Sequence, residues 1–131
     1  MSFKLEQKLA EFRITYIAEF NDKLTTLIKL WSEARTLQTL EAVKKFRFEV
    51  HSLKGSSGAL NFLMLSDRLG MIEEEVAPCE EQINTFKSII AFVDRHMNSM
   101  IEASKNNPNP LLVLRGMVAS TNESIEPQKK I

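Results

Sequence analysis

Apolar residues recur every three or four positions along most of the chain, which is the spacing of an amphipathic α-helix. The first segment with this pattern runs from Phe3 to Trp31 and contains no proline or glycine. We expect it to form a helix that bends or breaks near Asn21 and Asp22. Its apolar positions should face the rest of the fold: Leu5, Leu9, Phe12, Tyr16, Phe20, Leu24, Leu27, Ile28 and Trp31.

Three further segments with the same spacing follow, separated by residues that favour turns. Thr39 is a candidate N-cap for the second segment, Leu40–Leu60, because threonine is among the residue types preferred at helix starts. Asn61 marks the end of this segment, and Pro78 marks the end of the third. The fourth segment starts near Cys79 and fades at residues 106–110.

No segment alternates with a period of two for long enough to form a strand. Four amphipathic helices with short connections pack most economically as an antiparallel four-helix bundle. We therefore expect an all-α fold with the bundle in residues 1–107, an extra helical segment at the N-terminal end, and a C-terminal tail, residues 108–131. The tail opens with LLVLRGMVA, which could form a short extra helix, and continues with STNESIEPQKK, which lacks aromatic residues and is predicted to be disordered.

Length, charge and cysteine content narrow the class of protein. A chain of 131 residues fits one domain with one core. Its 17 basic and 17 acidic residues balance, so no overall positive field attracts nucleic acid or an anionic membrane surface. The single cysteine, Cys79, has no disulfide partner, and no apolar run approaches the roughly 20 residues that span a bilayer. We expect a soluble, cytoplasmic, free-standing protein with no nucleic-acid or membrane partner.

The stretch VHSLKGSSGAL, Val50–Leu60, is unusual for the middle of a helix. Each glycine costs a helix about 1 kcal/mol relative to alanine, so Gly55 and Gly58 require a functional or a packing reason. On a helical wheel, His51 lies opposite the apolar arc of this segment. The glycines and several cations share its face: Lys44, Arg47, Lys54, Gly55 and Gly58. Such a face is typical of a site that another macromolecule approaches closely.

The chemistry of this face favours a phosphoryl acceptor. Near neutral pH much of an imidazole is the free base, a nitrogen nucleophile that needs no dedicated base. Phosphoryl transfer requires positioning and charge compensation, and Lys54, one turn after His51, can supply an ammonium group. The other ring nitrogen needs an acceptor that fixes the tautomer, and Glu73 or Glu74 of the third segment could provide it.

The run His51-Ser52-Leu53-Lys54-Gly55-Ser56-Ser57, followed by Leu60, closely resembles the signature of histidine-containing phosphotransfer domains of multistep phosphorelays. The likeness covers roughly residues 10–105. It implies a four-helix bundle whose exposed histidine exchanges a phosphoryl group with the aspartate of a response-regulator receiver domain. One departure is Asn61, which stands where the family usually has glycine, although asparagine also tolerates a left-handed backbone.

The resemblance implies roles for the matching residues. His51 would carry the phosphoryl group on the nitrogen distal to the backbone, Lys54 would pair with that group, and Gly55 would leave room for the partner. Glu73 falls where several family members place a polar residue that hydrogen-bonds the histidine ring. The remaining candidates for the partner-binding face are Lys44, Arg47, Phe48 and Gly58.

The implied activity is that of a phosphocarrier, which accepts a phosphoryl group from one receiver domain and passes it to another, and not that of an ATP-dependent kinase. The partners would be receiver domains and a hybrid sensor histidine kinase. The chain itself would need no cofactor or metal, because magnesium belongs to the acidic pocket of the receiver. A monomer is sufficient for such a carrier.

The sequence leaves other interpretations open. The chain could be a helical adaptor that binds a receiver or sensor kinase through the same face without being phosphorylated, or an input domain cut from a larger sensor kinase. Gly58 could serve close helix packing, Phe48 could be buried against the first segment, and Glu73 could be one solvated carboxylate of an acidic run. His96 has no metal-ligand companion, and we expect it at the surface or at the edge of the core.

Overall fold

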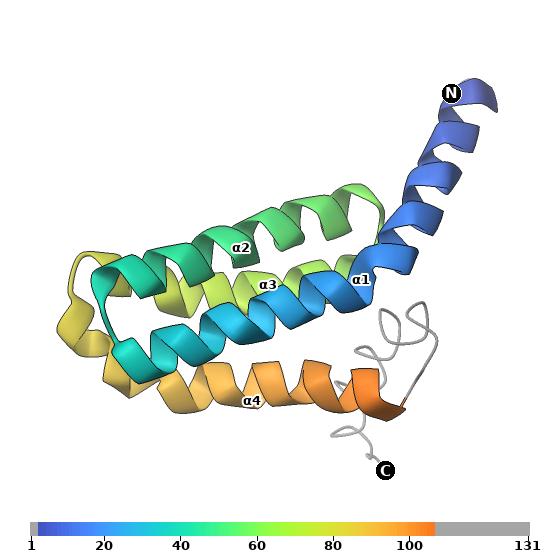
Figure 1. Cartoon of the computed structure of the whole chain (residues 1–131). Helices are drawn as coiled ribbons and strands as arrows, with labels where there is room; N and C mark the ends of the chain where they lie inside the picture. Colours follow the sequence, from blue (N-terminus) through green and yellow to red (C-terminus); the bar gives the residue numbers. More distant parts are fainter. Residues whose placement is uncertain (1–2, 107–131) are drawn as a thin grey trace, which may run out of the picture.

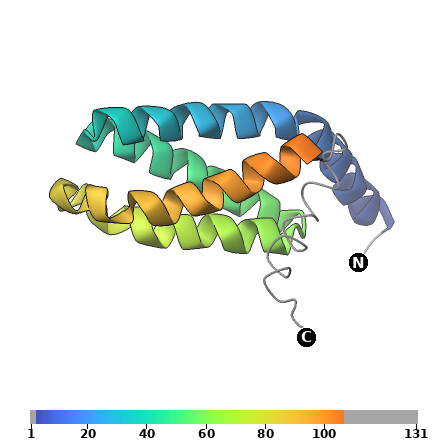
Figure 2. The same ribbon diagram turned by 90° about the horizontal axis from the view of Figure 1, so that it is seen from below.

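The computed structural model describes residues 3–106, which form a four-helix bundle (Figure 1). The helices are α1 (Phe3–Leu37), α2 (Leu40–Ala59), α3 (Leu63–Val76) and α4 (Phe86–Asn106), and two short 3₁₀ helices, η1 (Ala77–Glu80) and η2 (Ile83–Thr85), join α3 to α4. Each α-helix runs antiparallel to the next, as Figures 1 and 2 show. The predicted all-α class is confirmed, and residues 3–106 contain no strand.

The residues at its two ends set the boundaries of α2. At the start, Thr39 Oγ1 accepts a hydrogen bond from the backbone N–H of Ala42 at 3.2 Å, so Thr39 is the N-cap, as predicted. At the end, Asn61 has a φ of 70°, in the left-handed region that asparagine tolerates. The backbone N–H groups of Asn61 and Phe62 donate to carbonyl groups in the last turn of α2, which forms a Schellman motif. The turn between α2 and α3 therefore forms without a glycine at this position.

Helix α1 differs from the sequence prediction in two respects. Asn21 and Asp22 lie within the continuous helix, so the chain does not break there, although the axis of α1 changes direction along its length (Figure 1). Phe20, the residue before Asn21, is buried, so α1 packs against the other helices at this point. The first turns of α1 project past the end of the bundle (Figure 1), so Leu5 and Phe12 of the predicted apolar stripe are exposed. Burial along α1 begins only where the other helices lie alongside it.

The fourth helix begins at Phe86, later than the predicted start near Cys79. Pro78 lies in the first turn of η1, and Gln82 leaves the helical path with φ −137° and ψ 80°. Cys79 is buried in η1, where its thiol donates to the carbonyl of Glu75 at 3.7 Å. The two 3₁₀ turns therefore occupy residues that the hydrophobic spacing alone assigned to the fourth helix.

The bundle encloses one apolar core. The Trp31 ring packs against Phe46 of α2 and Phe86 of α4, and its Nε1 donates to Asp94 Oδ1 at 2.9 Å. Ser57 is fully buried, but its hydroxyl donates to a carbonyl of its own helix at 2.7 Å, so this polar group is satisfied. The largest fully buried side chains come from all four helices: Phe46, Phe86, Leu27, Leu65, Leu69, Ile72, Met97, Met100, Val43 and Val50.

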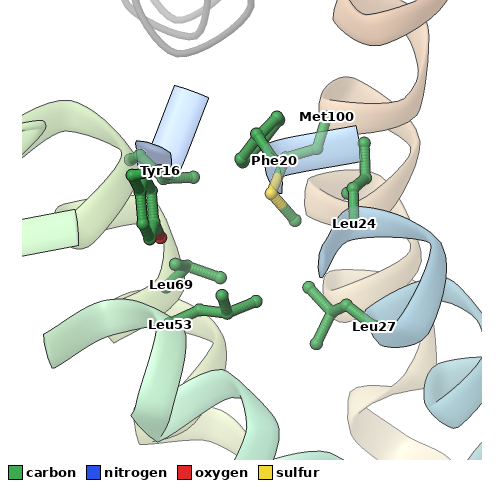
Figure 3. Close-up of a pocket in the computed structure, with 8 residues that line it drawn as sticks. Tyr16, Phe20, Leu24, Leu27, Leu53, Leu69 and Met100 are labelled. Carbon is green, nitrogen blue, oxygen red and sulfur yellow. The ribbon is translucent and has the colours of Figure 1, made fainter. Parts of the chain in front are cut away.

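A small cavity lies within this core (Figure 3). Its volume is about 10 Å³, which is room for one water molecule at most. Its walls are apolar, and are formed by Tyr16, Phe20, Leu24, Leu27, Leu53, Leu65, Leu69 and Met100. This cavity is too small to hold a ligand.

Within residues 3–106, no helix has both the length and the apolar character needed to cross a membrane. The predictions of a short helix in LLVLRGMVA and of a disordered end concern residues 108–131, which lie outside the described residues.

Candidate functional site

Helix α2 places His51 on the outer surface of the bundle. Val50 and Leu53 on either side are buried, with 0 % and 6 % exposure, and their burial sets the rotation of the helix about its axis. Because successive helical residues differ in direction by about 100°, the His51 side chain points away from the core. This side chain is 65 % exposed, as its position on the helical wheel predicts.

Glu73 of α3 contacts the imidazole through its carboxylate. Its Oε2 atom lies 2.9 Å from His51 Nδ1. The Glu73 side chain is only 13 % exposed and follows the buried Ile72, whereas the alternative candidate Glu74 is exposed. An ionised carboxylate only accepts hydrogen bonds, so Nδ1 carries the proton of the neutral ring. The lone pair that can act as a nucleophile is then on Nε2.

Lys54 approaches the same carboxylate. Its Nζ atom lies 3.5 Å from Glu73 Oε1, and 44 % of its side chain is exposed. The methylene groups of Lys54 lie against Gly70 of α3, where an added Cβ would stand 3.6 Å from Lys54 Cε. Sequence reasoning missed Gly70, whose only signal is that it interrupts the third apolar segment.

The two glycines near His51 have different surroundings. A Cβ atom at Gly55 would meet nothing within 4 Å, so this position is open to an approaching partner. A Cβ atom at Gly58 would stand 3.0 Å from Ser66 Oγ on α3, which is tighter than an ordinary contact. Ser66 Oγ also donates to the carbonyl of Lys54 at 3.1 Å, so α2 and α3 approach closely here. Helix packing, the alternative considered for Gly58, therefore accounts for this glycine.

Arg47 turns toward Glu73 and is 33 % exposed. Its Nη1 donates to Glu73 Oε2 at 3.2 Å, and its Nε donates to Oε2 of Glu80 in η1. The hydrogen bond to Glu80 is the main cause that raises the pKa of Arg47 above the ordinary arginine value. The sequence placed Arg47 on the partner-binding face and missed Glu80, because no local pattern shows that these two residues meet.

Two further candidates stand on the surface of α2. Phe48 is 69 % exposed, so the alternative that buried it against the first helix is wrong. Lys44 is also exposed. They precede His51 by about one and two helical turns, which places them on or near its face of the helix. An aromatic ring and a basic group are therefore available beside the histidine.

The charges at the site balance. Two cations and two carboxylates lie in contact beside His51: Arg47, Lys54, Glu73 and Glu80. Among residues 3–106, no cluster of three or more His, Cys, Asp or Glu side chains is arranged to hold a metal ion. The arrangement presents a nitrogen nucleophile in a fixed orientation, with an ammonium group within reach.

The second histidine has a different environment. His96 of α4 is half-buried, its ring lies 4.7 Å from that of Phe92, and its Nδ1 accepts a hydrogen bond from Arg68 Nη1 at 3.2 Å. Burial lowers the pKa of His96, and the positive charges of Arg68 and Arg95 lower it further. This is the edge-of-core position that the sequence predicted.

Comparisons with known proteins do not add to this geometry. No family model, no curated protein and no solved structure matches the chain. The fold is shown by the structure itself, and a function for the chain has to be argued from the site around His51.

Proposed function

We propose that this chain is a phosphocarrier of a multistep phosphorelay, in which His51 accepts a phosphoryl group from the aspartyl phosphate of one receiver domain and passes it to the aspartate of another. The observation that carries the proposal is the contact of His51 Nδ1 with Glu73 Oε2 at 2.9 Å, made by a ring that is 65 % exposed. This contact assigns the proton of the neutral ring to Nδ1 and leaves the lone pair of Nε2 available to a partner.

The transfer step can be written from these atoms. The lone pair of His51 Nε2 attacks phosphorus, the N–P bond forms, and the bond between phosphorus and the aspartyl oxygen breaks, so that the receiver regains its carboxylate. The proton stays on Nδ1, and the ring becomes a cation. The Glu73 carboxylate, which accepts the hydrogen bond from Nδ1, stabilises the positive charge that develops on the ring.

Lys54 and Gly55 can assist the incoming phosphoryl group and the receiver that carries it. Lys54 Nζ touches Glu73 only at 3.5 Å and belongs to a half-exposed side chain, so it can turn to the oxygens of the phosphoryl group at small cost. Gly55 leaves the surface beside the histidine free of any side chain, which allows the receiver to bring its aspartyl phosphate to Nε2. Phe48, exposed on the same helix, offers an apolar contact to the receiver.

The proposal also assigns the partners. The phosphoryl group would come from the receiver domain of a hybrid sensor histidine kinase or from another response regulator, and magnesium would be supplied in the receiver's acidic pocket. The association is transient, because the carrier must leave one receiver to meet the next. We propose that the chain acts as a cytoplasmic monomer.

The test is transfer of labelled phosphate from a phosphorylated receiver domain to the wild-type chain and to His51→Gln. His96→Gln is the matched control, since it removes the other histidine of the chain. We expect acid-labile, base-stable label on the wild type and on His96→Gln, and none on His51→Gln. Absence of label on the folded wild type with several receivers contradicts the proposal. If His51→Gln binds receivers as the wild type does and neither protein accepts label, the chain is an adaptor that acts by binding alone.

A further inference from the structure

Arg47 connects two carboxylates that belong to different elements. Its Nη1 lies 3.2 Å from Oε2 of Glu73 on α3, and its Nε hydrogen-bonds Oε2 of Glu80 in η1. The same Glu73 oxygen lies 2.9 Å from His51 Nδ1. Arg47 thus touches the group that orients the imidazole, although it does not touch the imidazole itself.

Glu73 needs a second cation to hold its orientation, because a phosphoryl group on His51 would compete with the Glu73 carboxylate for Lys54. A phosphoryl group on His51 carries about two negative charges and therefore attracts nearby cations. Lys54 is the cation that responds most easily, since its contact with Glu73 is the longer one at 3.5 Å and its side chain is 44 % exposed. Once Lys54 turns to the phosphoryl group, Arg47 is the remaining cation in contact with Glu73 within residues 3–106.

We propose that Arg47, held in place by Glu80, is a positioning residue that keeps the Glu73 carboxylate against Nδ1 of His51 and thereby keeps the nucleophilic lone pair on Nε2. The role of Lys54 in this argument rests on the proposed phosphocarrier function. The role of Arg47 toward the ring does not, because the contacts exist in the unphosphorylated protein.

The chemistry of the guanidinium suits this role. Arginine carries several N–H donors in a rigid planar fork, so Nε and Nη1 can serve two carboxylates at the same time and in a fixed direction. The ammonium group of lysine is a point charge on a flexible chain and does not impose that direction. Glu80 has a 15 % exposed side chain on the short helix η1, so it is a partly shielded anchor for the guanidinium.

The first experiment measures the tautomer of the His51 ring in the unphosphorylated protein. Long-range proton–nitrogen spectra distinguish a protonated from an unprotonated ring nitrogen, and are recorded on the alkaline side of the imidazole titration. We expect Nδ1–H to predominate in the wild type and to lose population in Arg47→Met. Lys45→Met is the matched control, because Lys45 is an exposed cation on the same helix and lies off the face that carries His51. Its His51 signals should match those of the wild type.

Two further variants keep the test decisive if Arg47→Met does not fold. Glu80→Gln should move the His51 signals in the same direction as Arg47→Met, by a smaller amount. Arg47→Lys should restore only part of the wild-type tautomer population, because it returns the charge without the planar fork. Unchanged His51 signals in a folded Arg47→Met or Glu80→Gln variant overturn the proposal.

The second experiment measures the rate of phosphoryl transfer from a phosphorylated receiver. We expect Arg47→Met to be about tenfold slower than the wild type, which is the rate effect of losing one charge-assisted hydrogen bond. The two readouts separate the two proposals. A tautomer change in Arg47→Met without any transfer to the wild type supports the positioning role and removes the phosphocarrier function. Normal transfer with an unchanged tautomer removes the positioning role alone.

Discussion

The two nitrogens of the His51 ring have different surroundings. Nδ1 lies 2.9 Å from the Glu73 carboxylate, whereas Nε2 makes no hydrogen bond to any residue in the described part of the chain. The helical wheel was sufficient to predict that His51 faces outward, because burial of its neighbours depends on the helical period alone. The spacing favoured Glu73 over Glu74, because Glu73 lies on the edge of the apolar stripe of the third segment, but whether its carboxylate reaches the ring depends on how α3 is rotated against α2.

Glu73→Gln tests whether the negative charge of the Glu73 carboxylate increases the rate of phosphoryl transfer. The amide oxygen can still accept the hydrogen bond from Nδ1, but it no longer stabilises the positive ring that forms during transfer. We expect transfer to slow roughly tenfold, measured as the initial rate at which label appears on the chain. Glu74→Gln, a change at the exposed neighbour, should transfer at the wild-type rate. A wild-type rate in Glu73→Gln would show that the charge has no role.

Gly55→Ala is expected to change the stability of the bundle and the access of a partner in opposite directions. The added methyl group meets nothing within 4 Å, and alanine is the better helix former, so the free energy of unfolding should rise by up to about 1 kcal/mol. In the proposed phosphocarrier the same methyl group would stand where the receiver approaches, so transfer should fall. Urea unfolding and the transfer assay measure the two effects. A variant that is more stable and transfers as fast as the wild type would show that Gly55 is not needed for access.

At the scale of elements, the contact between α2 and α3 creates the site. Gly58 lets the helices approach, and Ser66 joins them through its hydrogen bond to the carbonyl of Lys54. The caps of α2 were predictable, because Thr39 and Asn61 act on residues close to them in sequence. The packing role of Gly58 could be offered only as one alternative, because it depends on Ser66 of the other helix.

Asn61 tests the turn between these helices. Its φ of 70° is tolerated by glycine and asparagine, whereas a residue with a Cβ and no polar side chain is strained there. We expect Asn61→Gly to change the free energy of unfolding little, and Asn61→Ala to lower it by about 1 kcal/mol. Urea unfolding of the two variants is the measurement. Equal stability of the alanine and glycine variants would argue against strain at this residue.

Gly58→Ala tests how closely α2 and α3 pack. The new Cβ would stand 3.0 Å from Ser66 Oγ, so the serine side chain must shift slightly, which weakens its hydrogen bond to the carbonyl of Lys54. The gain in helix propensity is the same as at Gly55, and the loss of packing opposes it. We therefore expect Gly58→Ala to be less stable than Gly55→Ala in urea unfolding. Equal stability of these two variants would show that Ser66 moves without cost.

At the scale of the whole molecule, elements far apart in sequence come together at the site. His51 and Arg47 lie on α2, Glu73 lies on α3, and Glu80 lies in η1, beyond the end of α3. The tight turns of η1 and η2 take the place of the early part of the predicted fourth helix. This local departure from the predicted pattern is what places the Glu80 carboxylate beside Arg47.

The environment of His96 makes the stability of the bundle depend on pH. Burial and then the charges of Arg68 and Arg95 lower its pKa in the folded state, so the unfolded chain binds the proton more tightly. The stabilising contribution is complete above the ordinary histidine value of about 6.5, and is lost as pH falls from there through the lowered value. We expect the wild type to lose more stability than His96→Gln over this range in urea unfolding. Parallel curves for the two proteins would contradict this expectation.

The sequence by itself determined the four helices, the cap of α2, the left-handed turn at Asn61 and the outward direction of His51. Each of these depends on local spacing, or on a residue acting on near neighbours. Only the tertiary structure decided that the Glu73 carboxylate contacts the His51 ring, that Arg47 pairs with both Glu73 and Glu80, and that α1 extends past the bundle. The physical reason is that the rotation and offset of one helix against another are set by all the side chains packed between them. These side chains come from several segments, so no single segment determines the packing.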